Sequence, residues 1–120
     1  MSIAIFLLLA AAQPQPAAAP NWRPLGTMQG RFNLYYDGGR IERGADAVTI
    51  RIKREPFPAQ AGAPWWISRV EIRCAANSVR VVETVSHRPD GSVSRTDTVP
   101  QPFESIPAGS FVEAIHRDVC

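Results

Sequence analysis

The chain has 120 residues, which is enough for one small domain with a modest core. Thirteen Lys and Arg residues against eleven Asp and Glu residues leave a formal net charge of only +2 at pH 7, so bulk charge predicts no particular class of partner. Two cysteines, two histidines and no internal repeat argue against a multi-ligand metal centre and against a repeat array.

The chain begins with an apolar run over residues 3–12, followed by small residues and prolines, as in a secretory signal peptide and its cleavage region. A membrane span needs about 20 apolar residues, so this run is too short for one. Cleavage fits after Ala12 or after Ala19, and we prefer Ala12 because the second position places Pro20 next to the scissile bond. No Lys or Arg precedes the run, so an uncleaved N-terminal anchor is the alternative.

These features divide the chain into three parts. We predict a signal peptide over residues 1–12, a disordered Pro- and Ala-rich lead-in over 13–21 and one domain over 22–120. After cleavage no stable membrane span is expected. The cleavage region contains no cysteine, so we expect no lipid anchor.

Apolar and polar residues alternate along the middle of the chain, as they do in half-buried strands. The predicted strands are residues 31–37, 47–54, 65–74, 79–86 and 92–99, with turn signals at 37–40 and at Asp90-Gly91. In the fourth strand we expect Val79, Val81 and Val85 to share one face. The spacing, with no helical pattern in between, predicts an antiparallel meander of about five to six strands.

Only the last stretch has a helical period. Ser110 is followed three residues later by Glu113, a capping-box pattern in which each side chain is expected to bond the other's backbone N–H. Four apolar residues then share one helical stripe: Phe111, Val112, Ile115 and Val119. The predicted fold class is therefore α+β, an antiparallel β-sheet with one C-terminal α-helix packed on its apolar face.

Cys74 and Cys120 are the only cysteines. In an exported chain such a pair is expected to form a disulfide, because the compartment is oxidising. Cys74 shares its strand face with Val70 and Ile72, so a bridge to Cys120 would lay the apolar stripe of the helix across that face. The disulfide and the helix packing therefore support each other.

Several short motifs follow one another in a characteristic order. They are NWRPLG, YYDGGRIERGADAVTI, VEIRC, VRVVE with PDGS, and IPAGSFVEAIHRDVC. In this order they resemble the bacterial surface-adhesin protein E family over residues 21–120. The positions that carry the resemblance are Trp22, Tyr36, Asp37, Ile41, Gly44, Cys74, Pro107, Gly109, Ser110 and Cys120.

The resemblance implies a small exported antiparallel sheet with a C-terminal helix. Some members of that family act at the cell surface, where they bind host extracellular-matrix or serum proteins. This chain departs from the family in having no lipid-attachment cysteine.

No arrangement of residues in the sequence indicates an enzyme. His116 and Cys120 stand four residues apart on the predicted helix, but a zinc site needs three or four ligands and no second such pair exists. The predicted disulfide removes the thiolate that a cysteine nucleophile requires. His87 and His116 are accompanied by no Gly-x-Ser-x-Gly motif. We therefore expect no catalytic residue, no metal and no cofactor.

Basic side chains gather on the strand faces opposite the apolar ones. They are Arg51 and Lys53 on one strand, Arg69 and Arg73 on the next and Arg80 on a third. Solvation of an outward sheet face is the ordinary explanation, and a docking surface for an acidic partner is the functional one. Trp65, expected at the sheet margin, would add aromatic contact area, whereas Trp66 is expected in the core.

The sequence thus predicts an exported binding domain at the bacterial envelope, either periplasmic or secreted to the cell surface. The expected partners are host extracellular-matrix or serum proteins, or other envelope proteins. Nucleic acid is not expected, because the chain is exported and nearly balanced in charge. A periplasmic structural or accessory protein with no adhesive role is the alternative.

Overall fold

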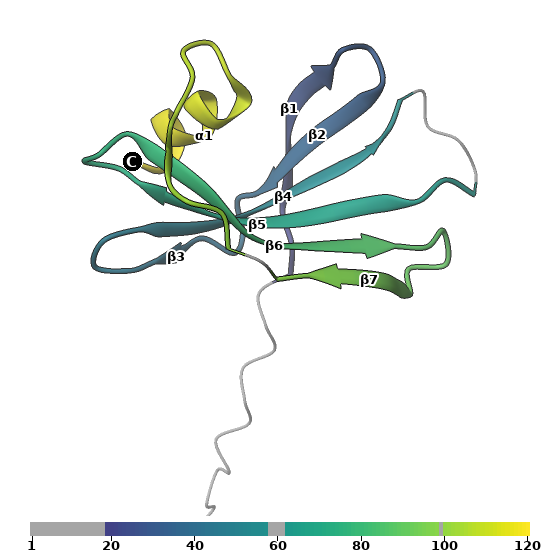
Figure 1. The fold of residues 1–120 in the computed structure, drawn as a ribbon. Helices are drawn as coiled ribbons and strands as arrows, with labels where there is room; N and C mark the ends of the chain where they lie inside the picture. Colours follow the sequence, from purple (N-terminus) through teal and green to yellow (C-terminus); the bar gives the residue numbers. More distant parts are fainter. Residues whose placement is uncertain (1–18, 58–61, 99) are drawn as a thin grey trace, which may run out of the picture.

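The computed structural model describes residues 19–57, 62–98 and 100–120, and it consists of one sheet with one helix (Figure 1). The elements in chain order are β1 (Trp22–Met28), β2 (Phe32–Asp37), β3 (Glu42–Arg43), β4 (Val48–Pro56), β5 (Trp65–Arg73), β6 (Ser78–His87), β7 (Val93–Asp97), β8 (Glu104–Ser105) and α1 (Phe111–Val119). The main sheet runs in the order β1-β2-β4-β5-β6-β7, while β3 pairs with β4 and β8 pairs with β6.

All of these pairings are antiparallel, and neighbours along the main sheet follow one another in the chain apart from the short β3. The predicted α+β class, an antiparallel meander with a C-terminal helix, is therefore confirmed. The structure adds β1, β3 and β8 to the predicted strands.

The signal peptide predicted over residues 1–12 lies outside the described residues, as does most of the lead-in predicted over 13–21. At the end of that lead-in, the Asn21 N–H donates to Asp37 Oδ1 over 2.8 Å, and the Asn21 carbonyl accepts from Gly38 N over 2.8 Å. The domain is therefore fastened one residue before β1 begins. Within the described ranges, no helix is long and apolar enough to cross a membrane.

The core lies between α1 and one end of the β4–β5 pair. Ile50, Ile72 and Ile115 are each fully buried. Ile115 and Val119 belong to the same cluster as the two strand isoleucines, which places the predicted helix stripe on the predicted sheet face. Burying one such side chain contributes about 1.5–3 kcal/mol, so this cluster supplies most of the apolar stabilisation at this end of the sheet.

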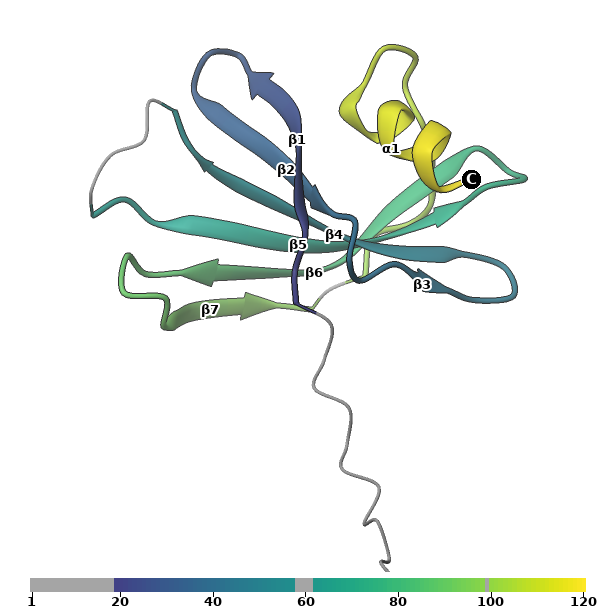
Figure 2. The same cartoon turned by 180° about the vertical axis from the view of Figure 1, so that it is seen from behind.

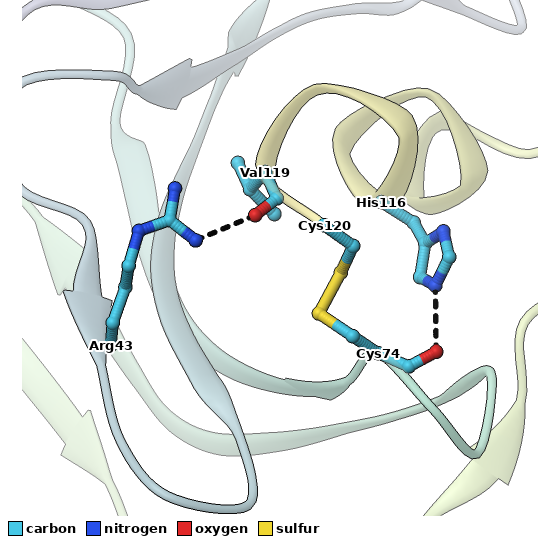
Figure 3. Close-up of a disulfide and its surroundings, with 5 residues drawn as sticks. All are labelled: Arg43, Cys74, His116, Val119 and Cys120. Atoms are coloured by element: carbon cyan, nitrogen blue, oxygen red, sulfur yellow. Dashed lines mark hydrogen bonds between the residues drawn. A yellow bond between two sulfur atoms is a disulfide. The ribbon is translucent and has the colours of Figure 1, made fainter.

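The predicted disulfide joins the helix to the sheet. Cys74 and Cys120 are bonded, with their Cα atoms 5.6 Å apart (Figure 3). His116 lies one turn before the bridge, and its Nε2 is 3.1 Å from the Cys74 carbonyl oxygen (Figure 3). The end of α1 is thus held to the turn after β5 by one covalent and one polar contact.

Two further contacts reach the end of the helix from other strands. Arg43, the last residue of β3, donates to the Val119 carbonyl oxygen over 2.7 Å (Figure 3). The Tyr36 hydroxyl on β2 donates to Asp118 Oδ2 over 2.8 Å. The first of these satisfies one of the four carbonyl groups that a helix leaves unpaired at its C-terminus.

The start of the helix is capped as predicted, but the capping box is not complete. Ser110 Oγ accepts the Glu113 N–H over 3.2 Å. The prediction that Glu113 returns the bond is wrong, because the Ser110 N–H donates to the Pro107 carbonyl oxygen over 3.3 Å. A turn before the helix therefore takes the place of the second half of the box.

A β-bulge in β6 changes the face on which Val85 lies. Val79 and Val81 face the helix side, as predicted, because they pair with buried residues of β5. The register then shifts, and beyond the shift Val85 pairs with Ile67 on the opposite face. The predicted common face is therefore wrong for Val85, since one extra residue inverts the alternation of a strand.

Trp66 lies on the helix side of the sheet but outside the buried core. Its ring is half-buried and meets the Phe32 ring edge-on, with centroids 6.1 Å apart. The nine-residue helix covers the opposite end of the sheet, above the hairpin that joins β5 to β6 (Figures 1 and 2). The prediction of a core position for Trp66 is wrong because α1 is too short to reach it.

Breaking the disulfide should destabilise the domain. We expect Cys120→Ser to lower the midpoint of thermal unfolding by about 10 °C or more, because a bridge that closes a long loop contributes about 2–4 kcal/mol. Calorimetry of the oxidised wild type, the reduced wild type and the variant measures this, and the two bridge-free samples should agree. Two free thiols in the oxidised protein would contradict the bridge.

The inverted face of Val85 can be tested with two identical truncations. Val70→Ala removes a buried side chain beneath the helix and should reduce the free energy of unfolding by about 2 kcal/mol. Val85→Ala, on the uncovered face, should cost clearly less. Urea unfolding of both variants gives the comparison, and equal losses would mean that Val85 belongs to the core after all.

Candidate binding surface

The predicted basic residues lie on the face of the sheet opposite α1, on which the described residues form no helix; we call it the outer face, and the face under α1 is the inner face. Arg51 pairs with Arg69 across β4 and β5, and Glu71 pairs with Arg80 across β5 and β6. Each of these residues alternates with a residue of the core, so they point away from α1. The residues of the outer face used below are Trp22, Tyr35, Arg51, Lys53, Glu55, Trp65, Ile67, Arg69, Glu71, Arg73, Arg80, Glu83, Val85 and His87.

Lys53 lies between two tryptophans on this face. Its Nζ is 5.7 Å from the ring centroid of Trp22 and 5.1 Å from that of Trp65. Cation–π contacts at such distances are attractive, and they connect β1 and β5 through β4. Trp22 was not predicted at this surface, because β1 was not predicted as a strand.

Trp65 lies at the margin of the sheet, as predicted, and stacks on His87. The two rings are 3.8 Å apart and inclined by only 3°. Trp65 and His87 are direct partners across β5 and β6, which brings the rings face to face. His87 Nδ1 is 3.1 Å from the Gly91 carbonyl oxygen, and since a carbonyl only accepts, Nδ1 carries the proton.

A shallow hollow of about 230 Å³ lies beside the stacked rings. Its lining residues are Arg51, Ile67, Arg69, Glu83, Val85 and His87. Small-molecule sites usually measure about 300–1,000 Å³, so this hollow is better matched to one side chain of a protein partner. Val85 lines it only because of the bulge in β6.

Arg73 and Arg80 form a separate group at the other end of the outer face. Their guanidinium carbons lie 3.7 and 4.5 Å from the ring centroid of Phe103, which precedes β8. Arg80 also forms an ion pair with Glu71 at 3.2 Å. The structure thus divides the predicted basic residues: Lys53 contacts the tryptophans, Arg51 and Arg69 line the hollow, and the other two pack against Phe103.

Tyr35 and Glu55 extend the aromatic group towards β2. The Tyr35 hydroxyl donates to Glu55 Oε1 over 2.8 Å, and Glu55 Oε2 is 3.6 Å from Lys53 Nζ. The hydrogen bond to the carboxylate raises the pKa of Tyr35, and burial raises it further. The carboxylate therefore connects a phenol to the ammonium group that lies between the tryptophans.

The residues weighed for metal or nucleophilic chemistry have structural roles. Cys74 and Cys120 are bonded to each other, and His116 contacts the Cys74 carbonyl. In the parts of the chain that the structure describes, no group of three or more His, Cys, Asp and Glu side chains could hold a metal ion.

Comparisons with protein-family models, with curated proteins and with solved structures find no match for this chain. The resemblance to the surface-adhesin protein E family therefore remains a prediction that rests on its motifs. Among the positions that carry it, Tyr36 and Asp37 are buried and the two cysteines form the disulfide. These positions maintain the fold and do not line the outer hollow.

Glu55→Gln should lower the pKa of Tyr35, because the carboxylate that favours the neutral phenol is removed. In the wild type the raised pKa means that this bond stabilises the fold fully below the ordinary tyrosine value of 10.0 and is lost as pH rises through the folded pKa. Carbon NMR of the tyrosine ring follows the titration, and Tyr35→Phe assigns the resonance. An unchanged Tyr35 titration in Glu55→Gln would contradict the bond.

Proposed function

We propose that this chain is an exported, non-enzymatic domain that binds a protein partner at the bacterial envelope through its outer face. The observation that carries the proposal is that Lys53 with its two tryptophans and the hollow lined by Arg51 and Arg69 share a face that no helix of the described residues covers. Aromatic residues and arginine are the types that dominate protein interfaces, where they provide contact area and charged hydrogen bonds.

The charges favour an acidic partner. Arg51 and Arg69 stand directly opposite each other on β4 and β5, and like charges in that position destabilise a sheet. Glu83, the partner of Arg69 on β6, brings one carboxylate to a hollow that two guanidinium groups line. A carboxylate of a partner placed beside Arg51 would balance the remaining positive charge.

The family resemblance points in the same direction. It favours host extracellular-matrix or serum proteins as partners, with other envelope proteins as further candidates. The disulfide is compatible with export to the periplasm or beyond it. A domain that binds a protein partner in this way needs a sheet face that the partner can reach, and the outer face is the one opposite α1.

A periplasmic structural or accessory role without adhesion is the second candidate. It is favoured by the group around Phe103, where Arg80 pairs with Glu71 and both arginines pack against the ring, so that part of the outer face is engaged within the chain. Cell fractionation separates the two proposals. Protein on the outer surface or in the medium supports adhesion, whereas strictly periplasmic protein supports the accessory role.

Charge reversal in the hollow tests the binding proposal. We expect Arg51→Glu with Arg69→Glu to weaken binding to immobilised extracellular-matrix and serum proteins by about tenfold or more, through loss of charge-assisted hydrogen bonds. Because Arg69 also pairs with Glu83 across β5 and β6, the reversal places two carboxylates opposite each other and should lower the stability somewhat, so binding is compared only for protein that calorimetry shows to be folded. Wild-type binding should also fall as salt is added.

The matched control is Arg95→Glu with Arg117→Glu, which changes the net charge equally at two exposed positions away from the hollow. We expect it to bind like the wild type. Surface plasmon resonance measures all three proteins, and calorimetry verifies their folding. An equal loss of affinity in both double variants would mean that binding depends on net charge alone. An unchanged affinity in Arg51→Glu with Arg69→Glu would refute the assigned surface.

A further inference from the structure

A groove of about 320 Å³ lies on the inner face, beyond the end of the sheet that α1 covers. Apolar side chains from four strands dominate its lining: Met28, Leu34, Ile52 and Val81. Val81 pairs with the buried Val70 and yet is 36% exposed. The apolar surface of the core thus continues past the helix and reaches solvent in this groove.

Two of the polar residues in the groove satisfy each other. Ser68 Oγ and Thr84 Oγ1, partners across β5 and β6, are 3.0 Å apart and share a hydrogen bond. The backbone groups of these strands are occupied by the sheet ladder. A peptide strand laid in the groove would therefore find few partners for its own N–H and C=O groups, which argues against a peptide as the occupant.

Arg54 is the remaining polar residue of the groove, and its charge is not neutralised within the described chain. Its guanidinium carbon lies 5.0 Å from the Phe32 ring centroid and 4.7 Å from that of Trp66. No ion pair to Arg54 occurs among the described residues, and its buried Nε has no hydrogen-bond partner there. Two aromatic rings therefore hold a cation at the end of an apolar groove.

We propose that this groove binds a free medium-chain fatty acid. The carboxylate would meet the Arg54 guanidinium, whose planar fork matches it in a bidentate pair. The alkyl chain would lie along Met28, Ile52 and Val81. The volume is at the small end of the usual range for ligand sites, about 300–1,000 Å³, which suits one short aliphatic chain.

This site is independent of the proposed protein-binding surface. Arg54 lies on the inner face, and its neighbours Lys53 and Glu55 lie on the outer face, because successive residues of a strand point to opposite sides. A change at Arg54 therefore leaves the outer hollow intact, and reversal of the outer arginines leaves the groove intact.

The test is isothermal titration calorimetry, in which sodium octanoate, kept below its micelle concentration, is titrated into the oxidised domain. We expect saturable binding of one octanoate. 1-Octanol should bind much more weakly because it lacks the carboxylate, and acetate because it lacks the long alkyl chain. Arg54→Gln should weaken octanoate binding by about tenfold or more. Arg51→Gln, on the outer face of the same strand, should bind like the wild type.

Absence of saturable octanoate binding, equal affinity for 1-octanol, or an unchanged affinity in Arg54→Gln would each overturn the proposal. Methyl NMR of the wild type keeps the test decisive even if Arg54→Gln fails to fold. Octanoate should shift the methyl signals of Met28, Ile52 and Val81. Shifts confined to Ile67 and Val85 would place the ligand on the outer face and refute the groove.

Discussion

The packing of α1 against the sheet is the constraint on which the other features depend. A helix of nine residues is not stable alone in water, so its position comes from Ile115 and Val119 in the core and from the bridge between Cys74 and Cys120. At 1.5 Å per residue the helix is only about 14 Å long. It therefore buries one end of the inner face and leaves the other end, like the outer face, without a helix.

The bulge in β6 lets the two ends of one strand present their valines to opposite faces of the sheet. Near the disulfide, Val79 and Val81 must face the helix side, where their partners on β5 are buried. Beyond the bulge the alternation is inverted, and Val85 joins Ile67 on the outer face among arginines. In the binding proposal these two aliphatic side chains form the apolar centre of the interface, and the arginines around them form its polar rim.

Alternation of residues was enough to predict β2, β4 and β5, and the helical period was enough to predict α1, because each is a local pattern with one buried side. The disulfide was predicted from the pair of cysteines and the expected export. The bulge could not be predicted, because unbroken alternation already gives β6 an apolar face with Val79, Val81 and Val85, and nothing in the sequence marks the register shift. β1 was missed because Pro24 and Gly26 interrupt it, and Gly26 adopts a φ of +125° where its pairing with β2 shifts. The contact between Lys53 and Trp22 was missed with it, because Trp22 lies on β1.

β4 connects the two proposed sites through its register. Val48 and Ile50 are buried under the helix, and a slip of one residue would expose them and bury Thr49 and Arg51 instead. The core therefore dictates that Arg51 and Lys53 face outward and that Ile52 and Arg54 face inward. Each face thus receives cations from the same strand, among the arginines and tryptophans on one side and beside the apolar groove on the other. Because the surroundings of these cations differ while their charge does not, we propose a protein partner for the first face and an aliphatic acid for the second.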